Sequence, residues 1–178
     1  MITNPTIRGV ISLTLIIFST LGYAKKKEFY LDEPSKKDTE TILRLQIFLD
    51  ESNFGPGKID GEMGQFTRKA VAHYNYSKGI DYNNYYKAIN ESENQIKDLY
   101  VTYSIKEQDL TYIGELSLEP EEQSKIEYMY YRSVLEFVAE RFHSDEKFIR
   151  KINPNIEWAT ITTGTEIKVP NITPFQID

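Results

Sequence analysis

Two stretches of the chain place apolar residues at helical spacing on either side of a glycine-rich loop. In the first stretch, Ile42, Leu45 and Leu49 share one face of a helix. The second stretch carries a complementary stripe, which consists of Phe66, Ala70, Val71 and Tyr74. The pattern predicts two packed helices joined by a plugged loop, in which Ile59 points inward.

Beyond these helices the hydrophobic pattern weakens and then changes its period. A third helix is predicted over residues 82–89, and the polar residues 91–99 are predicted to be a linker. Residues 100–105 then alternate with β-branched and aromatic side chains, which is typical of a short strand. Residues 106–122 contain glycine and proline breakers and are predicted to be a long surface connection.

The last part of the chain predicts two short helices and a second strand. Ser133 is expected to cap the first helix, with Glu136 as its capping-box partner. Ser144 and Asp145 are expected to cap the next helix, and residues 164–170 alternate as a strand. The predicted fold class is therefore mainly α, with a small α+β part.

The N-terminal residues have the pattern of an export signal. Arg8 is the only charge before an uncharged run over residues 10–21, and Ala24 ends a motif of small residues suited to cleavage. The run is shorter than the roughly 20 residues that a spanning helix needs, so no stable membrane insertion is expected after cleavage. We predict a signal peptide at 1–24, an exposed leader at 25–37, and export to the periplasm, the cell envelope or the outside of the cell.

Composition narrows the classes of partner. The chain has no cysteine, so its stability has to come from apolar cores. Its formal net charge of −6 disfavours nucleic acid and anionic lipid surfaces, and neither is predicted as a partner. The 13 tyrosines suit contact with sugars, although tyrosine is also common as a half-buried residue in small domains.

The first two helices and their loop combine several motifs: Leu45-Gln46, Leu49, Phe54-Gly55-Pro56-Gly57, Ile59-Asp60-Gly61, Gly64, Thr67 and Ala70-Val71. In this combination the residues resemble the three-helix peptidoglycan-binding domain found beside many cell-wall enzymes. The resemblance covers residues 38–90. The chain departs from the family at Tyr74-Asn75, where the family usually has Phe-Gln.

The C-terminal part carries a second set of motifs: Phe142-His143-Ser144, Ile152-Asn153-Pro154-Asn155 and Gly164-Thr165-Glu166-Ile167-Lys168-Val169-Pro170-Asn171. They look like a LysM-like βααβ unit, which here spans residues 100–172 with a long insertion after its first strand and is followed by a tail at 173–178. Such a unit commonly follows the peptidoglycan-binding domain in the non-catalytic N-terminal part of exported L,D-transpeptidases. In that family a catalytic domain with a His and a Ser-His-Gly-Cys motif comes next.

The chemistry of the sequence does not favour catalysis. A cysteine nucleophile is absent, and His73 and His143 lie on different predicted units without metal-ligand spacing. We therefore predict no enzyme activity, no metal site and no cofactor. Asp60 and Glu62 are the acids tied to a special turn, where Asp60 either holds the turn by bonding backbone amides or faces a ligand.

The predicted peptidoglycan-binding residues form two groups. The first group flanks the glycine-rich loop and consists of Phe54, Asp60, Gly61, Met63, Thr67 and Tyr74. The second group is implied by the LysM resemblance and consists of Asn153, Pro154, Asn155 and Ile156. Phe54 and Tyr74 fit a core role as well, and Asn153-Pro154 also serves to end a helix. Trp158 is either a sugar platform or a plug of the second core.

These observations predict a non-catalytic, exported protein that binds peptidoglycan through two weak modules. A cell-wall enzyme is a second candidate partner. Two alternatives stay open. One is a truncated or decayed L,D-transpeptidase whose catalytic domain was lost or lies in a partner chain. The other is an envelope protein that uses its tyrosine-rich surface to bind another protein.

Overall fold

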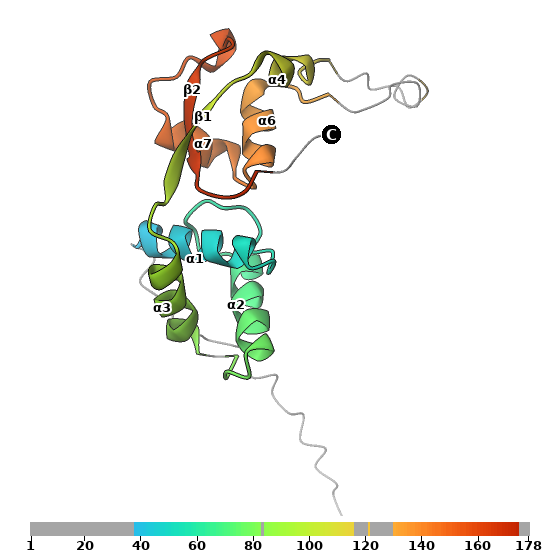
Figure 1. Ribbon diagram of the computed structural model, residues 1–178. Helices are drawn as coiled ribbons and strands as arrows, with labels where there is room; N and C mark the ends of the chain where they lie inside the picture. The colour runs from blue at the N-terminus through green and yellow to red at the C-terminus, as the bar shows by residue number, and fades with distance from the viewer. Residues whose placement is uncertain (1–37, 83, 116–120, 122–129, 175–178) are drawn as a thin grey trace, which may run out of the picture.

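The computed structural model describes residues 38–82, 84–115, 121 and 130–174. The predicted signal, the leader and most of the predicted tail lie outside these residues. The elements are α1 (Thr39–Glu51), α2 (Gln65–Ser77), α3 (Tyr85–Gln95), β1 (Tyr100–Ser104), α4 (Glu107–Thr111), α6 (Val134–Arg141), α7 (Glu146–Ile152), a 3-10 turn (Trp158–Thr160) and β2 (Glu166–Pro170). The described chain is mainly helical with one small sheet, so the coarse prediction of fold class is confirmed (Figure 1).

Helices α1, α2 and α3 pack around one core, with α1 lying across the ends of the other two (Figure 1). Asp38 caps α1 by accepting the Thr41 N–H at 3.1 Å. Gly79, with a φ of 68°, follows α2 in the left-handed conformation that glycine adopts without strain. This first core consists of Leu45, Phe48, Leu49, Ala70, Val71, Tyr74, Tyr85, Ala88 and Ile89.

Two details of the helical part differ from the sequence prediction. Helix α3 continues to Gln95 and so overlaps the predicted linker at 91–99. Phe66, predicted to lie in the buried stripe of α2, is 64% exposed. The buried stripe instead runs from Thr67 to Tyr74 at intervals of three and four residues. Phe66 precedes that stripe by one residue, which turns it about 100° around the helix, away from the core.

The remaining elements form a small α+β part. Strands β1 and β2 pair antiparallel, with Tyr100 opposite Pro170 and Ser104 opposite Glu166. Helices α6 and α7 contact each other, and α7 also contacts β2. Along the described residues β1 is followed by α4, α6, α7 and the 3-10 turn before β2, and the short helix α4 lies in the segment predicted to be a surface connection.

Helix α1 contributes to both cores because it is apolar on two faces. Leu43 and Ile47 pack into the second core, where Ile59 from the following loop joins them. The Ile59 N–H donates to the His143 carbonyl at 2.7 Å, and its carbonyl accepts the Ser144 hydroxyl at 2.6 Å. Ile59 therefore points inward as predicted, but it closes the second core rather than the space between α1 and α2.

Side-chain contacts also fix α1 and its loop to the α+β part. The His143 imidazole lies 2.9 Å from the Asp50 carboxylate. The Lys58 ammonium lies 2.8 Å from the Asp145 carboxylate at the start of α7. Together with the shared core, these contacts hold the two predicted modules in one orientation.

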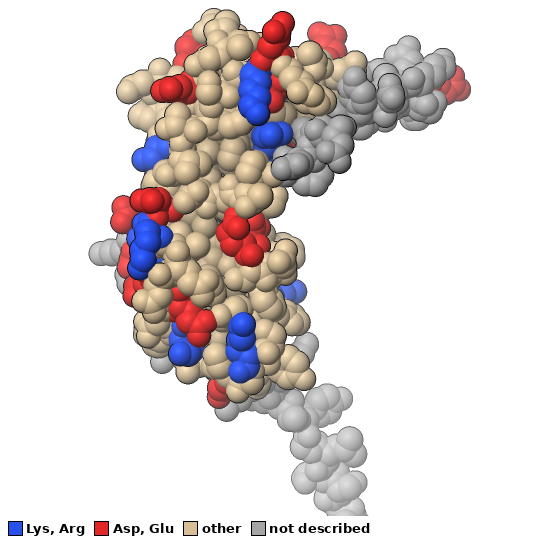
Figure 2. Space-filling view, viewed as in Figure 1, with Lys and Arg blue, Asp and Glu red and all other residues tan. Residues whose placement is uncertain are grey.

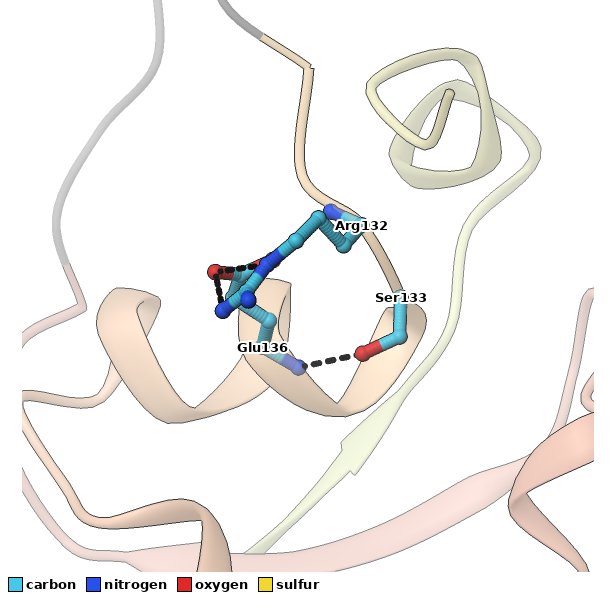
Figure 3. Close-up of polar contacts among 3 residues, drawn as sticks. All are labelled: Arg132, Ser133 and Glu136. Atoms are coloured by element: carbon cyan, nitrogen blue, oxygen red, sulfur yellow. Dashed lines mark hydrogen bonds and ion pairs between the residues drawn. The ribbon is translucent and has the colours of Figure 1, made fainter. Parts of the chain in front are cut away.

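The start of α6 shows how a neighbour changes a local motif (Figure 3). Ser133 Oγ accepts the Glu136 N–H at 3.1 Å, as the predicted cap requires. The Glu136 carboxylate bonds to Arg132, accepting its backbone N–H at 2.7 Å and its guanidinium at 2.6 Å. These bonds hold the pKa of Glu136 below its usual value. One half of the predicted capping box is formed, and Arg132 has replaced the other half.

Candidate functional site

A buried glutamine on α1 organises the loop that follows the helix. Gln46 is 1% exposed. Its Oε1 accepts the N–H of Asp60 at 3.1 Å and that of Gly61 at 2.8 Å. Its Nε2 lies 3.1 Å from the Lys58 carbonyl and 3.0 Å from the Glu62 carbonyl. Because both ends of the amide are engaged, the loop is held in one conformation against α1.

Three predicted binding residues help to build this loop. Asp60 is half-buried, and its carboxylate accepts the Glu62 N–H at 2.8 Å. Gly61 has a φ of 73°, and a Cβ there would lie 2.9 Å from a backbone oxygen. Thr67 is buried and donates to the Pro56 carbonyl at 3.0 Å. The contacts of Asp60 are those of the turn-holding alternative, while its remaining surface faces solvent.

An open groove of about 240 Å³ lies where the loop meets α2. We call it the aromatic groove, and its lining residues are Phe54, Gly55, Phe66, Lys69, Ala70 and His73. Phe66 is largely exposed, and Lys69 and His73 are exposed beside it on the same helix. The groove therefore presents two phenyl rings with a cation and an imidazole at its edge.

Buried aromatic side chains pack behind the lining of the groove. The rings of Phe54 and Tyr74 meet edge to face, with centroids 5.4 Å apart. The Tyr74 hydroxyl donates to the Glu91 carboxylate. Burial, together with that carboxylate, raises the pKa of Tyr74 to about 12. Phe66 lies against Gly57 of the loop, where an added Cβ would come within 3.0 Å of the Phe66 Cβ.

This arrangement suits a ligand that has flat apolar faces and an acceptor or negative charge at its rim. Exposed aromatic rings contact such faces, and a few polar groups fix the orientation. The Lys69 ammonium lies 5.9 Å from the centroid of the Phe66 ring, so it reaches the edge of the groove. His73 supplies a ring nitrogen that donates or accepts according to its tautomer.

Phe54 is the predicted binding residue that lines the aromatic groove. Met63 is half-buried next to the first core, and its sulfur accepts the Tyr85 hydroxyl at 3.3 Å. Trp158 is half-buried against the second core, and the Arg150 guanidinium lies 5.7 Å from its ring. This position corresponds more closely to the plug than to an open sugar platform.

The second predicted group lies around the end of α7. Asn153 is 8% exposed and joins α7 to β2. Its Nδ2 donates to the Lys168 carbonyl at 2.8 Å, and its Oδ1 accepts the Lys168 N–H at 2.8 Å. Pro154 and Asn155 are exposed, and Ile156 is half-buried. These residues are not among those that line the aromatic groove.

Phe66, Lys69 and His73 were not among the residues predicted from the sequence to bind a ligand. Their spacing in the sequence could have identified them, since positions 66, 69 and 73 fall on one helix face. That face is next to the buried stripe that begins at Thr67. A large aromatic residue at the edge of a buried stripe can line a groove there. A shift of one position along the helix decides whether such a residue is buried or exposed.

Acidic and basic side chains are interspersed on the face shown in Figure 2, and neither sign forms a broad patch among its described residues. Within the described ranges, no three His, Asp or Glu side chains come close enough together to hold a metal ion. The helices in that part of the chain are all too short or too polar to cross a bilayer.

The chain matches no protein-family model, and no curated protein matches it. The resemblances to a peptidoglycan-binding domain and to a LysM unit therefore rest on the motifs of the sequence. They stay predictions, and the function drawn from them is a proposal.

Proposed function

We propose that the chain is an exported, non-catalytic protein that binds peptidoglycan through the aromatic groove. The observation that supports this most is the exposure of Phe66 beside Phe54 in an open groove. Burying a phenylalanine side chain is worth about 1.5–3 kcal/mol, so a ring left in solvent next to a groove suggests a ligand rather than a packing role.

Peptidoglycan offers the features that this groove suits. Its N-acetylated sugars have apolar and amide faces that can lie against phenyl rings. Its stem peptides carry free carboxylates, which Lys69 and His73 can meet at the rim. The residues near the end of α7 that follow the LysM-like pattern would supply a second, weaker contact.

The packing of the two parts gives this proposal a mechanism. Because α1 serves both cores, the two contacts would lie on one rigid body. Binding at one contact then presents the other at high effective concentration, without the entropy of ordering a linker. The protein would hold on to the polymer by avidity, although each contact alone is weak.

A sacculus pull-down tests the proposal with a matched pair of variants. The chain over residues 25–178 is mixed with purified sacculi, and the bound fraction is compared for Phe66→Ala and Tyr76→Ala. Both residues are exposed aromatics on α2, at 64% and 77%, but only Phe66 lines the aromatic groove. We expect Phe66→Ala to weaken binding about tenfold, or about 1.4 kcal/mol, and Tyr76→Ala to leave it unchanged.

Equal binding of these two variants would place the contact outside the aromatic groove. The proposal would be refuted if the unchanged chain bound sacculi no better than a charge-matched control protein.

A second candidate function is a protein-interaction module, which exposed tyrosines near the turn between α2 and α3 favour. Tyr76, Tyr82 and Tyr86 are 77%, 39% and 56% exposed. Tyrosine is enriched in protein interfaces because it combines a large ring with a hydroxyl. In crosslinking on intact cells, this function predicts one specific protein partner that is lost with Tyr76→Ala and kept with Phe66→Ala.

A further inference from the structure

A second groove, of about 300 Å³, lies between the loop after α1 and helix α7, where the two parts of the fold meet. We call it the interface groove, and its lining residues are Asp60, Glu62, Asp145, Lys147, Phe148 and Lys151. The loop contributes the first two residues, and the start and body of α7 contribute the others. The groove thus exists only when both parts are packed together.

Some of these charges are already used within the protein. Asp145 pairs with Lys58 at 2.8 Å and accepts the Lys147 N–H at 2.9 Å, so its carboxylate is occupied. The side chains of Glu62, Lys147 and Lys151 are exposed, and none of them forms an ion pair with another described residue. On the loop side the Glu62 carboxylate is therefore free, while Oδ1 of Asp60 already accepts from the Glu62 N–H and the Gln46 amide. Free ammonium lies on the helix side.

The position of the two lysines favours a ligand that carries a carboxylate. Lys147 and Lys151 are four residues apart on one short helix, a spacing at which like charges repel each other. Between them in sequence, Phe148 is 6% exposed and belongs to the second core, so it gives the groove a fixed apolar floor. A ligand carboxylate at these ammonium groups would relieve the repulsion.

The balance of charge indicates which ligand fits. The charge of Asp145 is compensated by Lys58, so Asp60 and Glu62 on one side are matched by two lysines on the other. A purely anionic ligand would meet the two loop carboxylates, and a purely cationic ligand would meet the two ammonium groups, so each would be repelled on one side. A molecule with one charge of each sign satisfies both sides.

We propose that the interface groove is a binding site for a zwitterionic ligand, namely a short peptide with free ends. Its ammonium binds Asp60 and Glu62. Its carboxylate binds Lys147 and Lys151, and its aliphatic part lies over Phe148. This site goes beyond the proposed function and does not depend on it, because a soluble peptide would bind here whether or not the aromatic groove binds a polymer.

The test is an NMR titration of residues 25–178 with trialanine, which has one ammonium, one carboxylate and no charged side chain. N-acetyl-trialanine lacks the ammonium, and trialanine amide lacks the carboxylate. We expect trialanine to shift the resonances of Glu62, Lys147 and Lys151, and each blocked peptide to bind at least tenfold more weakly. Tenfold corresponds to about 1.4 kcal/mol.

Two variants at exposed positions assign the ends of the peptide. Glu62→Gln should weaken trialanine and remove most of the penalty for N-acetylation, whereas Lys151→Gln should do the same for the amide. Glu93→Gln and Lys97→Gln, exposed on and just after α3, are the matched controls and should change nothing. The proposal is overturned if trialanine binds no more tightly than about 10 mM, if all three peptides bind equally, or if the variants and their controls behave alike.

Discussion

Gln46→Ala is the substitution that most directly tests how the loop is held. The change leaves the N–H groups of Asp60 and Gly61 without their acceptor. It also removes the donor that reaches the Lys58 and Glu62 carbonyls. A buried polar group left unpaired costs about 1–3 kcal/mol. Because Gly61 is buried and Asp60 is half-buried, the two amides together should cost about 3 kcal/mol of unfolding free energy.

The assay is urea unfolding followed by Trp158 fluorescence, with thermal unfolding in parallel. For a chain of this length, a loss of about 3 kcal/mol should lower the melting temperature by about 6–12 °C. Gln65→Ala is the matched control, because Gln65 is exposed at the start of α2 and should change the free energy by less than about 0.5 kcal/mol. If Gln46→Ala is no more destabilising than Gln65→Ala, the loop is not held by this amide.

Two further predictions concern residues that the sequence assigned to ligand binding. The pKa of Tyr74 is raised to about 12 by burial and by the Glu91 carboxylate, so its neutral hydroxyl contributes stability below pH 10 that is lost as the pH rises toward 12. Tyr74→Phe keeps the ring, and its urea midpoint should fall less between pH 8 and pH 11 than that of the unchanged chain; an equal fall would contradict this. Asn153→Ala breaks the link between α7 and β2 and should cost about 2 kcal/mol, whereas Asn155→Ala, at an exposed position, should cost little in the same unfolding experiment.

Hydrophobic spacing and local turn chemistry predicted much of the fold. The stripe of Ile42, Leu45 and Leu49 marked α1, and alternation marked β1 and β2. The caps at Ser133 and Asp145 are present, because each depends on bonds between residues only two or three positions apart. Interactions of this range are encoded in adjacent residues, so they can be read without knowledge of the rest of the chain.

Part of the candidate site could also be predicted, and part could not. The glycine-rich loop was predicted because turns need particular residues, and Phe54 was predicted because it flanks that loop. Phe66 did not, because its exposure depends on which residue of α2 begins the buried stripe. The charges of the interface groove come from residues about 85 positions apart, and their proximity depends on Ile59 packing into the second core.

The sequence by itself determined where α1, α2 and the two strands form, and the turn that Asp60 and Gly61 make. Only the tertiary structure decided that α1 is shared by two cores, that Thr67 and Asn153 are occupied by internal bonds, and that two grooves flank the same loop. The physical reason is that spacing along a chain reports which face a residue takes on its own element. It does not report which other element covers that face, since this depends on contacts between residues distant in the sequence.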